Sequence, residues 1–452
     1  MILNARKLNI FHIIKEKNIS ELYSWKYKSE KIYHISKKFF SIVGLRVISN
    51  FYKRYTWDQP LIYQNENGIL GIIRRNKNGE TEYLMQANVE PGNINKLQIS
   101  PTVQATKSNY TRVHGGKKIK YLNFFLNKTK WLVNSKQTEQ GFIYLFKKNT
   151  NILLNINRNI NFSKNYKWIQ KKHLISMIEK KNILNMDTLS VFSCSINKNS
   201  FDSPIDSMKQ INNWLAYMKK RYYIKVNRIK LSNMKNWVLT NKNIFHKSKS
   251  FFSIIGVRVS TKSREVNYWD QPLIKNSSLH FAGFLVKKIN STTHYLVRFI
   301  VEPGLKSGSL TCTVKTSNVE SYRKNNNLSV KSKFILKNFF FKKNKSSVKY
   351  DTIQSHEGGR FYQSQIRYMV VQLNDQQKIK IDKNYKWISQ NQMVYLIKKG
   401  VYFSNTITTC QYTGQVMQSI FTSRFPVAVK TTKKLHTEMH SKTSPLLLLK
   451  NH

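Results

Sequence analysis

Short runs of hydrophobic residues, bounded by Gly, Pro and Asn, occur throughout both halves of the chain. GILGIIRR, TEYLMQANV, NKLQISPTVQAT and, later, YLVRFIVEPG are rich in strand-forming residues. Apolar residues recur at helical spacing in KKHLISMIEKK (171–181) and in QNQMVYLIKKG, which ends at Gly400. A further helix is predicted over DSMKQINNWLAYMKKRY (206–222). The pattern predicts an α+β fold with mostly antiparallel or mixed sheets and flanking helices.

The chain contains two copies of one sequence pattern. WDQPLI occurs at 57–62 and at 269–274, and the offset of 212 also relates FFSIVGLRV to FFSIIGVRV and VEPG to VEPG. KNYKWI returns with an offset of 219, so an insertion falls in the lysine-rich stretch 325–351. A period above 200 residues indicates a duplicated domain. We expect repeats at 1–198 and 225–411, a linker helix within 199–224, and a loosely ordered tail at 412–452.

Composition supports folded domains but does not identify a partner. The 452 residues suffice for two domains, and 40% apolar with 13% aromatic residues favours packed cores. The net charge of +55 is typical of nucleic-acid binders. Lys, Asn, Ile, Tyr and Phe share codons rich in A and T, however, so we favour base-composition bias over a nucleic-acid footprint. Such a surface still attracts anionic substrates.

Other sequence features indicate a cytoplasmic protein. The cysteines Cys194, Cys312 and Cys410 are isolated, which predicts neither a disulfide framework nor a zinc site. The N-terminal segment breaks its apolar runs with Lys, Glu or Asn and does not resemble a signal peptide. No stretch approaches 18 consecutive apolar residues, so no membrane span is expected.

Two polar clusters are candidates for chemistry. The segment 90–116 gathers Gln104, Ser108, Asn109, Tyr110, Arg112 and His114 after a strand-like run. The second cluster is TEQG (138–141), answered by SHEGGR (355–360), with Glu139 and Glu357 taken as equivalent. A carboxylate beside a histidine suits proton transfer, and an adjacent arginine suits a pyrophosphate.

Structural roles compete with functional ones at several positions. Trp57 and Trp269 of WDQPLI are interpreted as core aromatics that anchor a turn before Pro, rather than as ligand platforms. Asp58 and Asp270 are expected to bond nearby backbone N–H groups. P-loop, dinucleotide-binding, zincin and α/β-hydrolase motifs are not found in the sequence.

The motifs WDQPLI, EPGN, SPTVQATKSNYTRVHGG, TEQG, NMDTLSVFSC and SHEGGRFY resemble the NDP-hexose 2,3-dehydratases of deoxysugar and natural-product biosynthesis. The resemblance runs from about Trp25 to Cys410. It implies a Nudix-like fold repeated twice, a homodimer, and a sugar-nucleotide pocket in each half, of which one is catalytic. The run of metal-binding glutamates of a Nudix box is not found, so pyrophosphate hydrolysis is not expected.

The resemblance also implies a substrate and a reaction. The substrate is dTDP-4-keto-6-deoxyglucose, which loses the C3 proton and the C2 hydroxyl to give a 3,4-diketo sugar, the substrate of a partner 3-ketoreductase. The step requires acid–base groups and enolate stabilisation, without a redox cofactor or a metal. The alternative from another class is a non-catalytic basic protein that binds nucleic acid or a nucleotide sugar. An epimerase or another dehydratase on this scaffold would share the enolate.

Site residues follow from the resemblance position by position. Trp25 and Trp237 are expected to face the nucleotide. The first pocket is expected to be lined by Ser108, Asn109, Tyr110, Thr111, Arg112, Thr138 and Glu139. The second is expected to be lined by Arg298, Thr316, Ser317, Asn318, Ser321, Tyr322, Ser355, His356, Glu357, Gly358, Gly359 and Arg360.

The second pocket is the hypothetical catalytic centre, because His, Glu and Arg coincide in its sequence. Glu357 or His356 would be the base, and Tyr322 the acid or enolate donor. Tyr110 and His114 of the first pocket are the alternative. Val319 and Glu320 depart from the first copy's pattern, and Thr138 departs from the family's pattern, in which a serine is usual.

Overall fold

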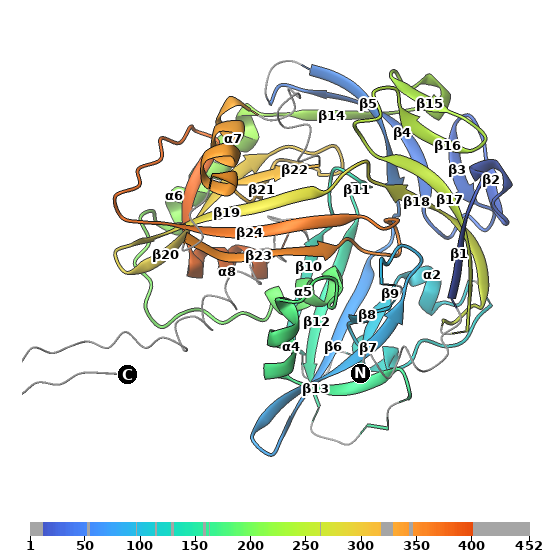
Figure 1. The fold of residues 1–452 in the computed structure, drawn as a ribbon, viewed down its shortest axis with the longest axis horizontal. Helices are drawn as coiled ribbons and strands as arrows, with labels where there is room; N and C mark the ends of the chain where they lie inside the picture. Colours follow the sequence, from blue (N-terminus) through green and yellow to red (C-terminus); the bar gives the residue numbers. More distant parts are fainter. Residues whose placement is uncertain are drawn as a thin grey trace, which may run out of the picture.

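The computed structural model describes residues 12–51, 55–95, 97–113, 115–127, 131–156, 160–161, 163–262, 264–317, 329–342 and 347–400. These residues form a sheet-rich, mixed α+β structure with few helices, as predicted (Figure 1). The predicted tail 412–452 and Cys410 lie outside the described residues.

Each repeat contains one seven-stranded sheet. The first has the order β10-β12-β6-β7-β13, with β8 beside β7 and β9 beside β6. Its strands are β6 (Gly68–Lys77), β7 (Glu80–Val89), β8 (Leu97–Ser100), β9 (Val103–Ala105), β10 (Trp131–Thr138), β12 (Lys148–Asn155) and β13 (Tyr166–Gln170). β12 runs parallel to β6 and the other pairs are antiparallel, so the sheet is mixed.

The second seven-stranded sheet repeats this arrangement in the order β21-β20-β19-β24-β23, with β22 beside β19 and β25 beside β20. Its strands are β19 (His280–Ile289), β20 (Thr292–Ile300), β21 (Ser309–Thr311), β22 (Val314–Thr316), β23 (Val348–Ser355), β24 (Gln365–Leu373) and β25 (Tyr385–Ser389). The predicted strand runs are confirmed, and Pro101 separates β8 from β9.

Two smaller sheets exchange strands between the repeats. In one, β11 (Tyr144–Leu145), β5 (Tyr55–Tyr63), β4 (Ser41–Ser49), β3 (Lys31–His34) and β2 (Trp25–Tyr27) are joined by β14 (Ile224–Ile229) of the second repeat. In the other, β18 (Tyr268–Lys275), β17 (Ser253–Thr261), β16 (Asn243–His246) and β15 (Trp237–Leu239) are joined by β1 (His12–Lys17) of the first. Each repeat therefore completes the other's sheet.

WDQPLI forms strand rather than the expected turn. Both copies lie within β5 and β18, where Pro60 is opposite Gly44 and Pro272 is opposite Gly256. The glycine at 44 is needed because its missing β-carbon would lie 2.9 Å from the carbonyl oxygen of Ile229 in the exchanged strand. The close approach of β14 therefore explains why the residue opposite Pro60 is a glycine, and WDQPLI is part of a strand and not of a turn.

The buried aspartates of both motifs hold the exchanged segments. Asp270 accepts two bonds from Arg258, and its Oδ2 also accepts the backbone N–H of Tyr23 at 2.8 Å. Asp58 is bonded in the same way by Arg46 and by the backbone N–H of Lys235. The predicted backbone bonds are confirmed, with partners in the opposite repeat.

The helices are few and mostly short. α4 (Lys171–Ile178), α6 (Met208–Arg221) and α8 (Gln390–Lys399) correspond to the three predicted helices. A helix that was not predicted, α5 (Met186–Ser193), is buried along its whole length. The others are α2 (Lys107–Tyr110), α3 (Leu122–Leu126), α7 (Val330–Ile335) with a π-helical continuation over Leu336–Phe341, and 3-10 turns at Ile19–Glu21 and Leu231–Asn233. No helix among the described residues is long and apolar enough to cross a membrane.

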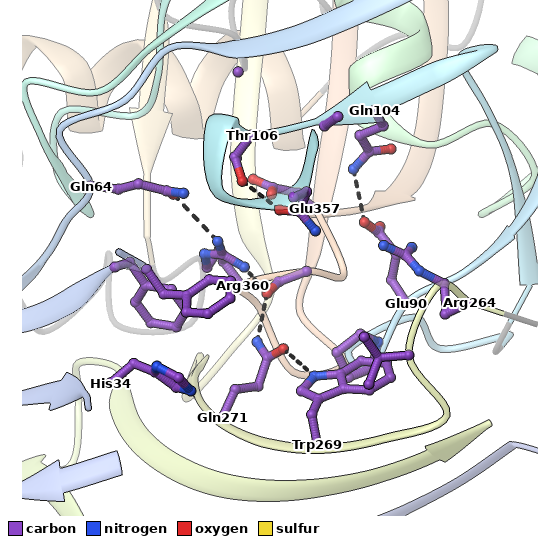
Figure 2. Close-up of a pocket in the computed structure, with 18 of the residues that line it drawn as sticks. His34, Gln64, Glu90, Gln104, Thr106, Arg264, Trp269, Gln271, Glu357 and Arg360 are labelled. Atoms are coloured by element: carbon purple, nitrogen blue, oxygen red, sulfur yellow. Dashed lines mark hydrogen bonds between the residues drawn. The ribbon is translucent and has the colours of Figure 1, made fainter. Parts of the chain in front are cut away.

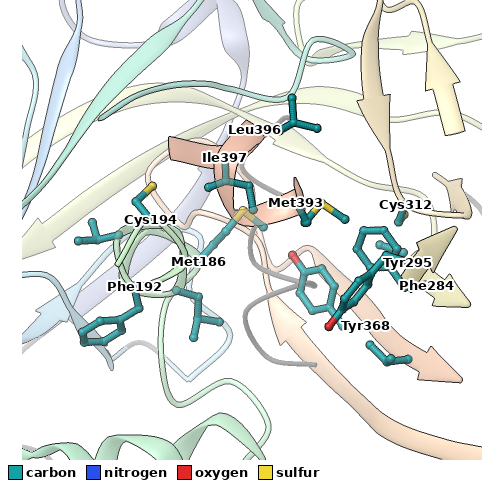
Figure 3. Close-up of a cluster of buried hydrophobic side chains, with 14 of the residues drawn as sticks. Met186, Phe192, Cys194, Phe284, Tyr295, Cys312, Tyr368, Met393, Leu396 and Ile397 are labelled. Atoms are coloured by element: carbon teal, nitrogen blue, oxygen red, sulfur yellow. The ribbon is translucent and has the colours of Figure 1, made fainter. Parts of the chain in front are cut away.

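One hydrophobic core crosses the boundary between the repeats. Figure 3 shows Met186 and Phe192 of α5 on one side, Tyr295 and Tyr368 of the second sheet on the other, and α8 between them. Met393 of α8 is fully buried in this cluster. The two repeats are therefore packed together through their cores.

Candidate active site

A cavity of about 390 Å³ opens between the first seven-stranded sheet and segments of the second repeat. Its floor comes from the first repeat, and its rim from the segment 264–271 and the loop 357–360 (Figure 2). The lining includes Trp25, His34, Phe39, Phe40, Gln64, Glu90, Gln104, Asn109, Glu139, Tyr144, Lys147, Asn149, Arg264, Tyr268, Trp269, Gln271, Glu357, Gly359 and Arg360. This volume and polarity suit a polar small-molecule ligand.

Glu90 follows β7 and is 4% exposed. Its Oε1 accepts a 2.8 Å hydrogen bond from Gln104 Nε2, and its buried Oε2 has no partner among the described residues. Burial and the charge of Glu357 raise the pKa of Glu90 to about 7, although Arg264 and Arg360 oppose this shift. A carboxyl group with this pKa can give or take a proton near neutral pH.

Glu357 supplies a second carboxylate to the same cavity from the opposite repeat. Its Oε2 accepts a 2.7 Å hydrogen bond from the hydroxyl of Tyr144. Burial, with the charge of Glu357, holds the pKa of Tyr144 well above its usual value, so this phenol stays protonated. A β-carbon at Gly359 would lie 3.3 Å from Glu90 Oε1 and 3.4 Å from Glu357 Oε1, so the two carboxyl groups flank this glycine.

Two arginines stand at the rim. The Arg360 guanidinium lies 4.1 Å from the centre of the Phe40 ring and donates to Gln64, while its Nε has no partner among the described residues. Arg264 donates to Asn88 at 2.9 Å. Paired guanidinium groups can bind phosphate oxygens through several hydrogen bonds at once.

Aromatic side chains complete the rim. Trp269 donates to Gln271, and Gln271 in turn donates to the Gly359 carbonyl, so the indole is oriented by the loop that carries Glu357. Trp269 is partly buried: it packs against the hydrophobic cluster of β17 and β18, as expected of a core aromatic, and it also lines the cavity. Trp25 also lines the cavity, and its indole donates to the Asp270 carbonyl at 2.7 Å.

The corresponding space in the second repeat is almost filled. Among the described residues it measures about 10 Å³ and is lined by Phe142, Phe251, Phe252, Asn276, Ser277, His280 and Ser317. His280 occupies the position in the second repeat that Gly68 occupies in the first, because the two residues differ by the repeat offset of 212. They also pair with equivalent strands, Gly68 with β12 and His280 with β24. The expectation of a comparable pocket in each half is not met by this part of the chain.

The strand register also corrects one predicted equivalence. Gly304 N–H donates to the Gly141 carbonyl, and Gly92 N–H donates to the Gly358 carbonyl, which sets the offset between these loops at 217. Glu357 is therefore equivalent to Gln140, and Glu139 to His356. Glu139 and Glu357 face the same cavity from different repeats, whereas the sequence suggested that they occupy separate ones.

His356 lies in the second repeat, away from the large cavity. Its Nε2 is 3.0 Å from Nδ1 of His280, and its ring stacks on Phe361. Burial and the neighbouring His280 hold the pKa of His356 well below its usual value. The predicted coincidence of His356 with Glu357 and Arg360 in one pocket is wrong, because adjacent residues of this loop point into different repeats.

The remaining predicted residues divide into three groups. Of the first-pocket set, Asn109 and Glu139 line the large cavity; Ser108 bonds Glu66, while Tyr110, Thr111, Arg112 and Thr138 are not among the lining residues. Arg298 is buried under α7, where it donates a hydrogen bond to Ser332. Trp237 is also buried. The large cavity is not lined by Thr316, Ser355 or Gly358. His114, Asn318, Ser321 and Tyr322 lie outside the described residues.

Sequence reasoning missed Lys147, Asn149, Tyr144, Arg264 and His34. None of them belongs to a recognisable motif. Tyr144, Lys147 and Asn149 align with the second copy only at an offset of 217, and the insertions conceal this offset in the sequence. Among the described residues, no group of three or more His, Cys, Asp or Glu side chains is placed to hold a metal ion.

A cavity that combines paired carboxylates, a buried lysine, arginines and aromatic rings defines an acid–base enzyme acting on an anionic, ring-bearing small molecule. The chain belongs to the NDP-hexose 2,3-dehydratase family, whose sequence model matches residues 4–195 and 208–409. The resemblance inferred from the motifs is confirmed, and so is the assignment as a hydro-lyase.

Three relatives are similar over most of their length. A dTDP-4-dehydro-6-deoxy-α-D-glucopyranose 2,3-dehydratase from Saccharopolyspora spinosa is 32% identical over 406 residues, covering 83% of this chain and 82% of the relative. Enzymes of the same name from Amycolatopsis orientalis and Streptomyces violaceoruber are 30% and 31% identical over 424 and 378 residues. These alignments cover 90% and 81% of this chain, and 88% and 84% of the relatives.

Proposed function

We propose that the large cavity removes water across C2 and C3 of dTDP-4-keto-6-deoxyglucose. The observation that carries this proposal is the asymmetry between the halves. By the loop offset of 217, Glu357 and Arg360 of the second repeat have the counterparts Gln140 and Ile143 in the first, and Tyr144 has the counterpart Phe361. These ionisable groups are therefore not among the residues that line the small cavity. Proton transfer therefore belongs to the first cavity.

The reaction begins with removal of the C3 proton by the Glu357 carboxylate. The C3–H electron pair forms a C3=C4 bond while the C4 carbonyl pair moves onto O4. The O4 pair then restores the ketone, the C3=C4 pair moves to C2=C3, and the C2–O bond breaks. The departing hydroxyl takes a proton from Glu90 and leaves as water. The remaining enol gains a proton at C2 and loses its O3 proton, giving the 3,4-diketo sugar.

The unlike surroundings of the two carboxyl groups support this division of roles. Glu90 is the more buried, and its raised pKa keeps it protonated to about pH 7, as an acid requires. Glu357 is partly exposed, and its Oε2 accepts a hydrogen bond from the Tyr144 hydroxyl. We assign no step to His356, which faces the second repeat.

The rim is proposed to hold the nucleotide. Arg264 and Arg360 would bind the pyrophosphate, and Trp269 or Trp25 would pack against the thymine ring. The excess of basic residues over the chain would raise the local concentration of this dianionic substrate.

The test is Glu357→Gln with purified protein and dTDP-4-keto-6-deoxyglucose, with product identified by mass and NMR in the presence of a 3-ketoreductase. We expect kcat to fall at least about 10²-fold, because the C3 base is lost, while dTDP affinity is kept. Glu80→Gln, at an exposed carboxylate paired with Lys172, is the matched control and should behave as wild type. Full activity of Glu357→Gln would contradict the proposal.

We further propose features that the family resemblance implies at the level of the whole protein. The repeats 1–198 and 225–411 would each be a Nudix-like domain from a tandem duplication, joined by the linker 199–224. The enzyme would act as a cytoplasmic homodimer, and a 3-ketoreductase would consume its product. Equivalent strand pairing in the two seven-stranded sheets supports the duplication.

A further inference from the structure

Lys147 is a buried ammonium group that the proposed steps do not use. It lines the large cavity and is only 6% exposed. Its Nζ donates a 2.6 Å hydrogen bond to the carbonyl oxygen of Glu66. A lysine has three N–H donors, so this bond positions the group while leaving donors for a ligand.

The backbone presents Lys147 through a constrained turn. Phe146, immediately before it, has φ of 57°, and its N–H donates to the Gly304 carbonyl of the second repeat at 2.9 Å. A non-glycine residue in this region of backbone space needs support from its surroundings. The inter-repeat bond supplies that support, so Lys147 is held where β12 begins.

The second repeat has the same turn without the lysine. Gln363 has φ of 48° and its N–H donates to the Gly92 carbonyl, as at Phe146. The next residue, Ser364, is the counterpart of Lys147. The turn is thus a property of the fold, whereas the ammonium group is a property of the large cavity alone.

Charged neighbours compensate the buried ammonium. Glu139, Glu357 and Glu66 favour its charged form, and Arg360 opposes it. Burial is the largest effect and lowers the pKa of Lys147 below its usual value. A weakly hydrated, buried ammonium is a stronger hydrogen-bond donor to a developing oxyanion than the same group in water.

We propose that Lys147 is a catalytic residue that donates a hydrogen bond to the C4 oxygen of the sugar as negative charge develops on it. This inference rests on the proposed dehydration. It completes the first step, in which the C3 proton passes to Glu357 and the carbonyl electron pair moves onto O4. Lys147 keeps its proton and stabilises O4 until the ketone is restored.

The test compares Lys147→Met with wild type by turnover, by exchange of the C3 hydrogen with deuterium from D₂O, and by dTDP affinity. We expect kcat and C3 exchange each to fall about 10²–10³-fold, because the enolate has lost a donor. We expect dTDP affinity to stay within about threefold, since the pyrophosphate and base contacts are unchanged. Lys172→Met, at an exposed surface lysine, is the matched control.

A chemical rescue separates catalysis from folding. Lys147→Cys should be as inactive as Lys147→Met, and alkylation with 2-bromoethylamine, which rebuilds a lysine-like side chain, should restore at least about tenfold in kcat. Wild type treated in the same way is the control, and the described cysteines Cys194 and Cys312 are both buried.

The two proposals fail separately because wild-type turnover is measured in the same series. Absence of wild-type dehydration would contradict the proposed function. Normal C3 exchange in Lys147→Met, beside an active wild type, would contradict only the role of Lys147. A misfolded Lys147→Met together with an alkylated Lys147→Cys that folds but shows no rescue would also overturn it.

Discussion

Glu90 and Glu357 are chemically identical side chains whose surroundings differ within one cavity. Glu90 is buried with an unpartnered Oε2, whereas Glu357 is partly exposed and hydrogen bonded by Tyr144. The charge of Glu357 also raises the cost of ionising Glu90. At the scale of single residues, function therefore depends on environment more than on residue type.

The raised pKa of Glu90 predicts a pH dependence of activity. If Glu90 is the acid, kcat/KM should decline as pH rises through about 7, because the carboxyl group loses the proton that it must donate. Glu90→Gln should be at least about 10²-fold slower at pH 6.5 and should lack this limb. A pH–rate profile of both proteins is the measurement. A wild-type rate that is flat from pH 6 to 8.5 would contradict the assignment.

The same group predicts a change in stability. The pKa of Glu90 is near its usual value of 4.5 in the unfolded chain and about 7 in the folded protein, so the folded state binds more protons between these values. The resulting stabilisation is complete at low pH and is lost as pH rises through about 7. Glu90→Gln should lose less unfolding free energy than wild type between pH 5 and pH 8, by about 1 kcal/mol or more in urea titrations.

At the scale of elements, exchange of β1 and β14 assembles the site. The β1 exchange brings Trp25 onto Asp270 and places the segment 264–271 over the first repeat. The loops at 138–141 and 355–358 cross in the same way, so Glu357 reaches the cavity of the first repeat while His356 stays in the second. The large cavity is consequently built from both halves of the chain.

Disrupting one exchanged strand should loosen the rim. A β-carbon at Gly256 would lie 2.7 Å from the Lys17 carbonyl, so Gly256→Val should displace β1 and cost about 1–3 kcal/mol of stability. Hydrogen exchange in residues 12–17 should accelerate at least tenfold. Ser260→Val, on the same strand and partly exposed, is the control. Unchanged protection of 12–17 in Gly256→Val would show that this close packing does not hold β1.

At the scale of the whole molecule, the shared core joins the repeats into one cooperative unit. α8 contacts β20 and β25 of its own repeat and β10 of the other. Gln137 Nε2 donates to the Ile397 carbonyl, and the equivalent Gln354 donates to Ile178, so each repeat's late helix is bonded to the other's sheet. Unfolding of one repeat alone would expose the surfaces at which each late helix packs on the sheet of the other repeat.

Calorimetry tests this cooperativity. Met393→Ala, at a fully buried position of α8, should lower the stability by about 2–5 kcal/mol and shift a single heat-absorption peak to lower temperature. Hydrogen exchange in β6 and in β19 should rise together. Val330→Ala, at a side chain that is 86% exposed, is the control. Two peaks, only one of which moves, would indicate independent repeats.

Hydrophobic periodicity was sufficient for most of the elements, and motif identity was sufficient for the family. The strand runs, α4, α6 and α8 were predicted because hydrophobic spacing is a local property. Two copies of WDQPLI and of VEPG were sufficient to recognise the repeated pattern in the sequence. The helix α5 was missed because it is short and buried on all sides, so its polar residues Asp187, Thr188, Ser190 and Ser193 do not mark a solvent-exposed face.

The sequence by itself determined which segments form strands and helices, and which family the chain belongs to, because these depend on local order and on motif identity. Only the tertiary structure decided that one cavity is open, that Glu357 serves the opposite repeat, and that Lys147 and Glu90 are buried beside it. The physical reason is that register, strand exchange and burial are set by contacts between residues hundreds of positions apart, and no local pattern records them.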